Sequence, residues 1–268
     1  MSKTLSIITV NRNNVIGLQK TMNSVYEQTN HDYEWIVIDG GSTDGSKELL
    51  QKNRDRINYW ISEPDKGIYD GMNQGIVQAH GDYLLFLNSG DCFANESVLD
   101  SFFAHHNQAD FIVGCFAKEG DRQQENAKQA TFSPEEEVFF LCIGAYPHQA
   151  TFIRRRVFEQ YGLYREDKKI ASDWYLAINA LFKGNATVSH LPILVSVCEK
   201  DGISTRFRQE LYQERIDLIR ENAFFSVLFE FYAGNREIVT ALRKNRFVFF
   251  LFRVYFYFYR KVRIRDSR

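Results

Sequence analysis

The residues most suited to chemistry in this sequence of 268 residues are carboxylates that directly follow predicted strands. Asp91 closes the polar segment 88–91, which comes after the apolar, strand-like run 82–87. A carboxylate among small residues at a strand end leaves room for a ligand, and its oxygens suit a hard cation such as Mg²⁺ or Mn²⁺. Such a cation would neutralise a diphosphate. The composition of 88–91 is also ideal for a plain turn, and taken alone it favours the turn.

Charged residues follow two other predicted strands. Asp39 ends a strand and could accept a hydrogen bond from a nucleobase or ribose, whereas Asp44 is better explained as a helix cap. The segment 63–75 combines glycines with charged residues, and Lys66 beside a helix start suits a phosphate. Taken alone, that segment is explained about as well by a solvated loop.

Two residues in the second half could move a proton. Asp173 stands in the first turn of a helix predicted over 172–184. On its own, this position favours a role in complementing the helix dipole, although a carboxylate can also act as a general base. His148 is a lone histidine, which more often makes a structural hydrogen bond.

The elements that must position these residues alternate between strand and helix. Strands are predicted at 5–10, 33–39, 57–61 and 82–87. The helices between them are predicted at 15–28, from 46, and at 69–80 with Gly81 as a left-handed cap. Single helices between strands indicate right-handed crossovers and a mostly parallel α/β sheet. Ligands bind beyond the carboxyl ends of such strands, so one face should carry the loops 9–14, 39–45, 63–70 and 88–91.

The second half of the chain is less regular. Its predicted elements are strands at 110–114 and 148–153, a capping box at 133–136, the helix over 172–184 and a long helix after the loop 199–205.

Composition excludes several classes of protein. With 44% hydrophobic residues and 4 prolines, the chain can bury a core and is not a disordered segment. The 4 cysteines lack the spacing of a zinc site or a disulfide framework, which predicts a reducing compartment. We expect no signal peptide, because the apolar run near the start is short, and no membrane-spanning helix.

Charge is distributed unevenly along the chain. From Arg243 to the end there are nine basic residues and one acid, so residues 1–242 carry a net charge of −9. An acidic body argues against nucleic acid as a partner. Nine of the thirteen residues in 247–259 are aromatic. We expect residues 243–268 to lie at a membrane surface, the alternative being a helix packed on the body or on a second subunit.

Together, these motifs resemble family 2 glycosyltransferases of the GT-A fold, in particular bacterial enzymes of capsule, O-antigen and exopolysaccharide synthesis. The resemblance rests, in order and spacing, on the runs 9–12 (TVNR), 37–46 (VIDGGSTDGS), 63–67 (EPDKG), 69–75 (YDGMNQG), 81–91 (GDYLLFLNSGD) and 171–175 (ASDWY).

The resemblance implies a role for each matching residue. Contacts with the donor nucleotide are implied for Thr9, Val10, Asn11, Arg12, Asp39, Asp65, Lys66 and Gly67. Contacts with the donor sugar are implied for Asp70, Asn73, Ser89 and Gly90. Asp91 would bind the metal, Asp173 would be the catalytic base, and His148 would lie on the acceptor side. Asn88 and Gly90 stand where carboxylates are common, so the cation would have one protein carboxylate besides diphosphate oxygens and water.

The resemblance also implies a domain plan and an activity. Residues 1–110 would be the nucleotide-sugar half of a GT-A domain, 111–205 the acceptor half, and 206–268 a helical tail. The implied reaction is inverting transfer from a UDP-sugar, with Mg²⁺ or Mn²⁺, to a lipid-linked saccharide in bacterial surface polysaccharide synthesis. The implied location is cytoplasmic, at the inner face of the inner membrane, and a homo-oligomer is compatible with it.

Two alternatives belong to other classes. A degenerate, nucleotide-sugar-binding partner of an active transferase would explain Asn88 and Gly90. A sugar nucleotidyltransferase would need a glycine-rich loop after the first strand, and residues 9–14 contain no glycine.

Overall fold

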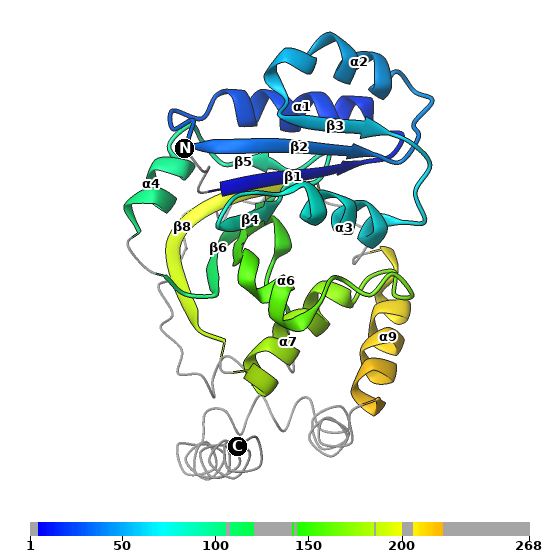
Figure 1. Ribbon diagram of the computed structural model, residues 1–268, viewed down its shortest axis with the longest axis vertical. Coiled ribbons are helices and arrows are strands. Elements are labelled where there is room, and N and C mark those ends of the chain that lie inside the picture. Colours follow the sequence, from blue (N-terminus) through cyan, green and yellow to red (C-terminus); the bar gives the residue numbers. More distant parts are fainter. Residues whose placement is uncertain are drawn as a thin grey trace. The chain divides into compact units, whose positions relative to one another are not determined.

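The computed structural model describes residues 5–105, 108–120, 141, 144–184, 186–199 and 206–221 (Figure 1). Contacts divide the chain into two units, Met1–Thr131 with Tyr146–Glu214, and Phe132–Ala145 with Arg215–Arg268. The first unit contains every strand described below. The capping box predicted at 133–136 and the tail at 243–268 lie outside the described residues.

The first unit is built on an eight-stranded sheet with the order β3-β2-β1-β4-β7-β6-β8-β5. Its parallel part consists of β1 (Leu5–Asn11), β2 (Tyr33–Asp39), β3 (Tyr59–Ser62) and β4 (Tyr83–Phe86). The order runs outward from β1 to β3 and then returns to β4, so right-handed crossovers put the first two helices on one face and the third on the other. Figure 1 shows this arrangement, and the predicted α/β architecture is confirmed.

The helices that cover the parallel strands are α1 (Val15–Tyr26), α2 (Ser46–Lys52) and α3 (Ile68–Gln78). On α1, the side chains of Leu18, Met22 and Val25 are buried in one cluster with the odd-numbered residues Leu5 and Ile7 of β1. Alternate residues of a strand point to opposite faces, so the even-numbered residues of β1 are left for α3.

Two glycines one turn apart let α3 lie against β1. A β-carbon at Gly75 would stand 2.4 Å from Ile8, and one at Gly71 would stand 2.9 Å from Val10. Such distances are too short for real carbon contacts, so any larger residue would push α3 off the sheet. This close approach keeps the start of α3 beside the carboxyl end of β1.

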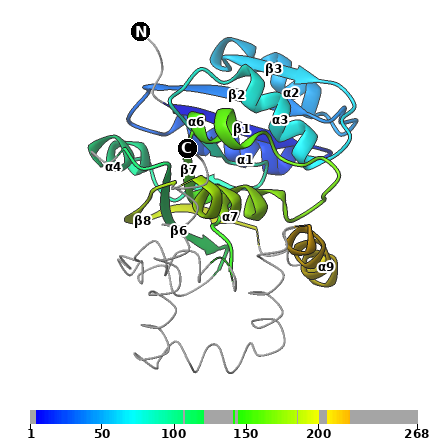
Figure 2. The same ribbon diagram turned by 60° about the horizontal axis from the view of Figure 1, so that its bottom comes forward.

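The remaining strands are β5 (Cys92–Phe93), β6 (Phe111–Lys118), β7 (Thr151–Arg154) and β8 (Val188–Cys198). β6 and β8 pair in parallel, whereas β7 pairs antiparallel with β4 and β6. The other helical elements are η1 (Arg54–Arg56), α4 (Val98–Ala104), η2 (His148–Ala150), α6 (Arg155–Tyr161), α7 (Ser172–Gly184) and α9 (Arg208–Arg220). Figure 2 shows α6 and α7 near β7.

Two local predictions were wrong. Gly81 is not a left-handed cap, because α3 ends at Gln78 and Gly81 is not among the residues with positive φ. The glycine is required instead because a β-carbon there would stand 2.6 Å from the backbone nitrogen of Ser6. The strand predicted at 148–153 is a short 3₁₀ turn over 148–150 followed by β7.

A buried carboxylate fastens β1, β2 and β4 together. Glu34 accepts hydrogen bonds from the hydroxyl of Ser6 and from the backbone N–H groups of His80 and Gly81. Burial alone would raise the pKa of Glu34, but these hydrogen bonds outweigh it and hold the pKa below its ordinary value of 4.5. Its charged form therefore stabilises the fold at neutral pH.

We expect Glu34→Gln to lower the free energy of unfolding by about 1–3 kcal/mol at pH 7, because three donors lose a charged acceptor. A lowered pKa gives stability that is complete above the ordinary value of 4.5 and is lost as the pH falls below it. The difference between variant and wild type should therefore shrink below that value. Urea unfolding at several pH values measures it, with exposed Glu63→Gln as the control. Equal stability of the two variants would contradict the prediction.

Candidate active site at the carboxyl ends of the strands

The four polar loops predicted to open on one face are joined there by hydrogen bonds. The loop after β1 meets the loop after β2, where the N–H of Asn13 donates to the hydroxyl of Ser42 over 2.7 Å. It meets the loop after β4, where the N–H of Ser89 donates to the carbonyl of Val10 over 3.1 Å. Asp44 caps α1 by accepting from the N–H of Val15, as its helix-cap prediction requires.

Two residues implied in nucleotide contacts are completely buried. The hydroxyl of Thr9 donates to the carbonyl of Leu87 and accepts from the indole N–H of Trp35. Asp39 accepts from the side chains of Asn11, Ser42 and Ser62, and Asn11 is buried with it. The structure therefore places Thr9, Asn11 and Asp39 as supports of the loops. A direct contact of Asp39 with a base would have to replace one of these hydrogen bonds.

The loop between β3 and α3 has an exposed rim and a buried base. Lys66 of this loop is exposed. Arg12 of the loop after β1 is also exposed, and one of its guanidinium nitrogens lies 3.5 Å from the buried carboxylate of Asp65. Asp65 accepts from the N–H of Gly67, and burial raises its pKa. Asp70 accepts from the N–H of Lys66 over 2.8 Å, which closes the turn before α3.

The side chain of Asn73 makes its hydrogen bonds inside the fold. It is buried, its amide donates to the carbonyl of Tyr164, and its oxygen accepts from the N–H of Tyr164. A second bond reaches the carboxylate of Glu166 at 3.2 Å. Asn73 thus holds α3 to the segment that follows α6, and its implied contact with the donor sugar stays a prediction.

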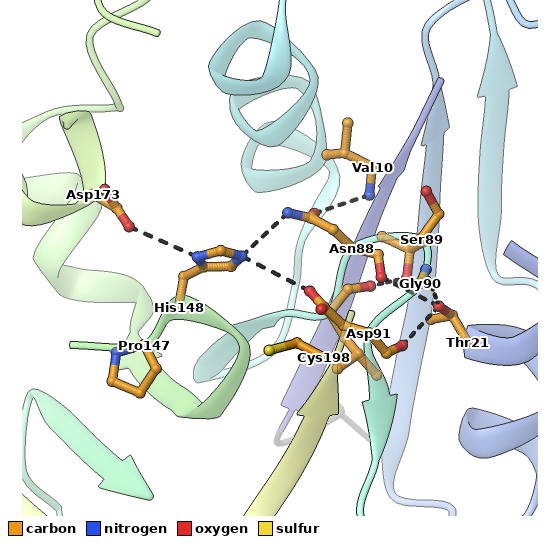
Figure 3. A network of polar contacts seen from close by, with 12 residues as sticks. Val10, Thr21, Asn88, Ser89, Gly90, Asp91, Pro147, His148, Asp173 and Cys198 are labelled. Carbon is orange, nitrogen blue, oxygen red and sulfur yellow. Dashed lines mark hydrogen bonds and ion pairs between the residues drawn. The ribbon is translucent and has the colours of Figure 1, made fainter. Parts of the chain in front are cut away.

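One residue of α1, Thr21, holds the segment 88–91 in place (Figure 3). The hydroxyl of Thr21 accepts from the N–H of Gly90 over 3.0 Å and lies 2.7 Å from the carbonyl of Asp91. Gly90 has φ +101°, and a β-carbon there would also meet the carboxylate of Glu199 at 3.0 Å. Glycine is therefore needed at this position for two reasons: it adopts the positive φ, and it leaves room for the carboxylate of Glu199. Ser89 beside it is half-buried.

The carboxylate of Asp91 is mostly buried and interacts with a histidine and a second acid. One of its oxygens is 4.0 Å from Nε2 of His148, and its side chain is 15% exposed. Burial raises the pKa of Asp91 from 3.8 to about 6; His148 acts to lower it and Glu199 to raise it. A carboxylate in this condition gains from a nearby cation.

The side-chain oxygens around Asp91 are suitable ligands for Mg²⁺ or Mn²⁺. Asp91 and Glu199 supply the hard carboxylate oxygens that these ions prefer. Among the described residues there is no group of three histidine, cysteine or acidic side chains arranged to hold a metal ion. A cation here would therefore rest on Asp91 and complete its coordination with ligand oxygens and water.

Asp173 is brought to the same histidine from the opposite side (Figure 3). Its Oδ2 lies 3.8 Å from Nδ1 of His148, while its Oδ1 accepts from the hydroxyl of Tyr69 over 2.9 Å and from the N–H of Trp174 over 2.8 Å. The amide of Asn88 lies 3.3 Å from Nε2 of His148. His148 thus stands between the two carboxylates to which the sequence assigns chemistry.

A comparison with known protein families shows to which family the chain belongs. Residues 6–162 match the family described as glycosyl transferase family 2. The chain belongs to this family. The resemblance that the sequence motifs predict is thereby confirmed for more than half of the chain.

Two mycobacterial proteins are among the curated relatives of this family 2 glycosyltransferase. Rv1514c of Mycobacterium tuberculosis, described as an uncharacterized glycosyltransferase, is 47% identical over 97 residues. That match spans 36% of this chain and 37% of the relative. The PGL/p-HBAD biosynthesis glycosyltransferase of Mycobacterium bovis is 26% identical over 220 residues, which span 80% of this chain and 84% of the relative.

Solved structures share the fold. TarS 1-349 of S. aureus in complex with UDP-GlcNAc has a TM-score of 0.65 and 19% identity, covering 81% of this chain and 66% of that one. The mannosyltransferase PcManGT of Pyrobaculum calidifontis, solved with GDP-Man and Mn²⁺, has a TM-score of 0.58 and 15% identity, covering 82% and 64%. The predicted GT-A fold is confirmed. Among the described residues, every helix is too short or too polar to cross a membrane.

In this family 2 glycosyltransferase, Glu214 of α9 supports the start of α7. Its carboxylate accepts from the backbone N–H groups of Lys169, Ile170 and Ala171, at 2.7, 2.9 and 3.0 Å. These residues directly precede Ser172 and Asp173. Glu214, Tyr69, Thr21 and Glu199 were not predicted from the sequence, because each contacts residues far away along the chain and no local pattern reveals such pairs.

Glu214→Ala should lower the free energy of unfolding by about 1–3 kcal/mol, because three N–H groups lose a charged acceptor. Hydrogen exchange should also become faster at residues 169–172. Urea unfolding and hydrogen-exchange mass spectrometry measure the two effects. Glu210→Ala, an exposed glutamate one turn earlier on α9, is the matched control. If both variants behave alike, Glu214 does not hold this segment.

Proposed function

We propose that this protein is an inverting glycosyltransferase that moves a sugar from a UDP-sugar to a hydroxyl of a saccharide acceptor. The observation that carries the proposal is the placement of Asp91 and Asp173 on either side of His148, at the carboxyl ends of the strands. Ligands of open α/β sheets bind at that edge. One carboxylate is suited to the leaving group and the other to the attacking hydroxyl.

Asp173 acts as the general base in this proposal. Its Oδ1 already accepts two hydrogen bonds, whereas Oδ2 faces His148 and accepts none of the hydrogen bonds found among the described residues. Oδ2 therefore has the capacity to accept the proton of the attacking hydroxyl. Attack on the anomeric carbon from the face opposite the diphosphate inverts the configuration. His148 beside Oδ2 would contact the acceptor.

The leaving diphosphate would bind above the loops that carry Lys66 and Ser89. Exposed Lys66 and Arg12 supply positive charge there, and the open space at Gly67 allows close approach of a ligand. A divalent cation at Asp91 would supply charge neutralisation of the diphosphate when bound. Glu199 is a second carboxylate within reach of that position. It would compensate in part for the absence of carboxylates at positions 88 and 90.

The acceptor and the location are proposed on different grounds. We infer a lipid-linked saccharide at the cytoplasmic face of a bacterial membrane, in surface polysaccharide synthesis. The basic and aromatic residues of 243–268 support it through their composition alone, since they lie outside the described residues. The name of the relative in PGL/p-HBAD biosynthesis is compatible with such an acceptor.

A panel of nucleotides tests the donor assignment. We expect UDP with Mn²⁺ to raise the melting temperature more than GDP or dTDP with Mn²⁺. We also expect slow release of UDP from at least one of UDP-GlcNAc, UDP-glucose and UDP-galactose, with water in place of the acceptor. Binding of UDP without hydrolysis of any donor would favour the degenerate partner. Stabilisation by GDP or dTDP alone would overturn the assignment of uridine.

A further inference from the structure

We propose that Tyr69 is the positioning residue of the catalytic base, and that it selects which oxygen of Asp173 takes the proton. This inference rests on the proposed function, because it needs Asp173 to be the base. Its starting point is a contact between residues 104 positions apart in the chain, in which the hydroxyl of Tyr69 donates to Oδ1 of Asp173 over 2.9 Å.

The hydroxyl of Tyr69 both donates and accepts a hydrogen bond at the start of α7. It also accepts a hydrogen bond from the backbone N–H of Ser172 over 3.1 Å. One tyrosine therefore holds both the carboxylate of the base and the backbone that carries it. Because the N–H of Trp174 also donates to Oδ1, this oxygen is saturated and Oδ2 is turned toward His148.

Tyr69 is a rigid and permanent donor. Its side chain is 5% exposed, and its ring lies 5.4 Å from that of Tyr164. Burial and the negative charge of Asp173 hold the pKa of Tyr69 well above its ordinary value of 10.0. The hydroxyl therefore keeps its proton, and keeps donating it, at every pH at which the enzyme would work.

Through its place in the chain, Tyr69 connects the proposed base with the loop proposed to bind the diphosphate. Tyr69 is the second residue of α3 and follows the proposed diphosphate loop at Lys66 and Gly67 directly. The loop that would receive the donor and the group that would activate the acceptor are therefore joined through a single side chain. Gly71 and Gly75 keep the start of α3 tight against β1, so this side chain has little freedom to move.

The chain offers a matched control for the hydroxyl of Tyr69. Tyr164 is buried against Tyr69 and close enough to Asp173 for its charge to raise the pKa of Tyr164, yet its hydroxyl has no hydrogen-bond partner among the described residues. Tyr69→Phe and Tyr164→Phe each remove one buried hydroxyl from the same cluster. Only the first removes a hydrogen bond to the base.

The test compares the rate of UDP release from the fastest-hydrolysed donor among UDP-GlcNAc, UDP-glucose and UDP-galactose, with Mn²⁺. Misplacing a catalytic group typically costs up to about 10²-fold, so we expect Tyr69→Phe to lower kcat by about 10–10²-fold. Tyr164→Phe should stay within about twofold. The Kd for UDP should be unchanged in both variants, because a positioning role affects the chemical step.

A double variant separates positioning from a structural role. If Tyr69 acts through Asp173, adding Tyr69→Phe to Asp173→Asn should change the residual rate by less than about twofold, since residues acting as a unit are strongly non-additive. Additive losses would overturn the inference. Equal rates for Tyr69→Phe and Tyr164→Phe would also overturn it.

The same data distinguish this inference from the proposed function. If Asp173→Asn retains activity, the base assignment fails and the inference falls with it. If Asp173→Asn is inactive while Tyr69→Phe matches Tyr164→Phe, the base assignment stands and Tyr69 alone is excluded.

Discussion

Replacing Asp173 by asparagine is expected to reduce the turnover of donor hydrolysis by about 10²–10⁴-fold, the usual contribution of a general base. Asparagine keeps the size of the side chain and can still accept the hydrogen bonds of Tyr69 and Trp174 at one atom. It cannot accept the proton of an attacking hydroxyl. The melting temperature and the Kd for UDP should therefore remain close to those of the wild type.

The matched control for this variant is Asp167→Asn, an exposed aspartate six residues earlier. UDP release with Mn²⁺ gives turnover, and titration with UDP gives the Kd. A purely structural Asp173 predicts a lowered melting temperature together with weakened UDP binding. If Asp173→Asn keeps more than about a tenth of wild-type turnover, the loss falls outside the range of a general base and His148 becomes the next candidate.

Asp91→Asn should abolish the part of the stabilisation by UDP that depends on Mn²⁺. A ligand at 100 times its Kd stabilises a protein by about 2.7 kcal/mol, so several degrees of melting temperature are at stake. The asparagine removes the carboxylate on which the cation would rest. Thermal shift with UDP alone and with UDP plus Mn²⁺ measures the difference. If Mn²⁺ raises the melting temperature equally in Asp91→Asn and in the exposed control Asp82→Asn, the assignment of Asp91 as the metal ligand is wrong.

The raised pKa of Asp91 adds a dependence on pH. Folding moves this pKa from 3.8 to about 6, so between these values the folded protein holds a proton that the unfolded chain has released. Without a cation, Asp91 therefore contributes less to stability as the pH rises through this window. Ligand-free Asp91→Asn should then be at least as stable as the wild type at pH 7. In the wild type, the Mn²⁺ increment should fall below about pH 6, where the proton competes with the cation.

The elements and the shared face of the loops could be predicted because local patterns determine them. Leu18, Met22 and Val25 mark one face of α1, and short apolar runs separated by single helices imply parallel strands. The orientation of each polar side chain could not be predicted in the same way. Thr9 and Asp39 lie near the carboxyl ends of β1 and β2 as expected, but Trp35, Asn11 and Ser42 use their polar atoms inside the fold.

The supports of the site depend on contacts between distant segments. Tyr69 and Asp173 are separated by 104 positions, and Glu214 reaches back 43 to 45 positions to the residues before α7. Periodicity and short motifs describe neighbours along the chain, so they carry no information on such pairs. The family resemblance was enough to identify the two carboxylates. The residues that orient these carboxylates could be identified only from the structure.

The position of Glu214 bears on how a shorter version of the protein should be designed. The family match ends at residue 162, before the proposed base, and a boundary drawn there would remove α7 as well. A boundary just before α9 would keep every strand of the sheet and both aspartates, yet would leave the N–H groups of 169–171 without their acceptor. The smallest fragment worth expressing for crystallography or enzymology therefore extends through the whole of α9.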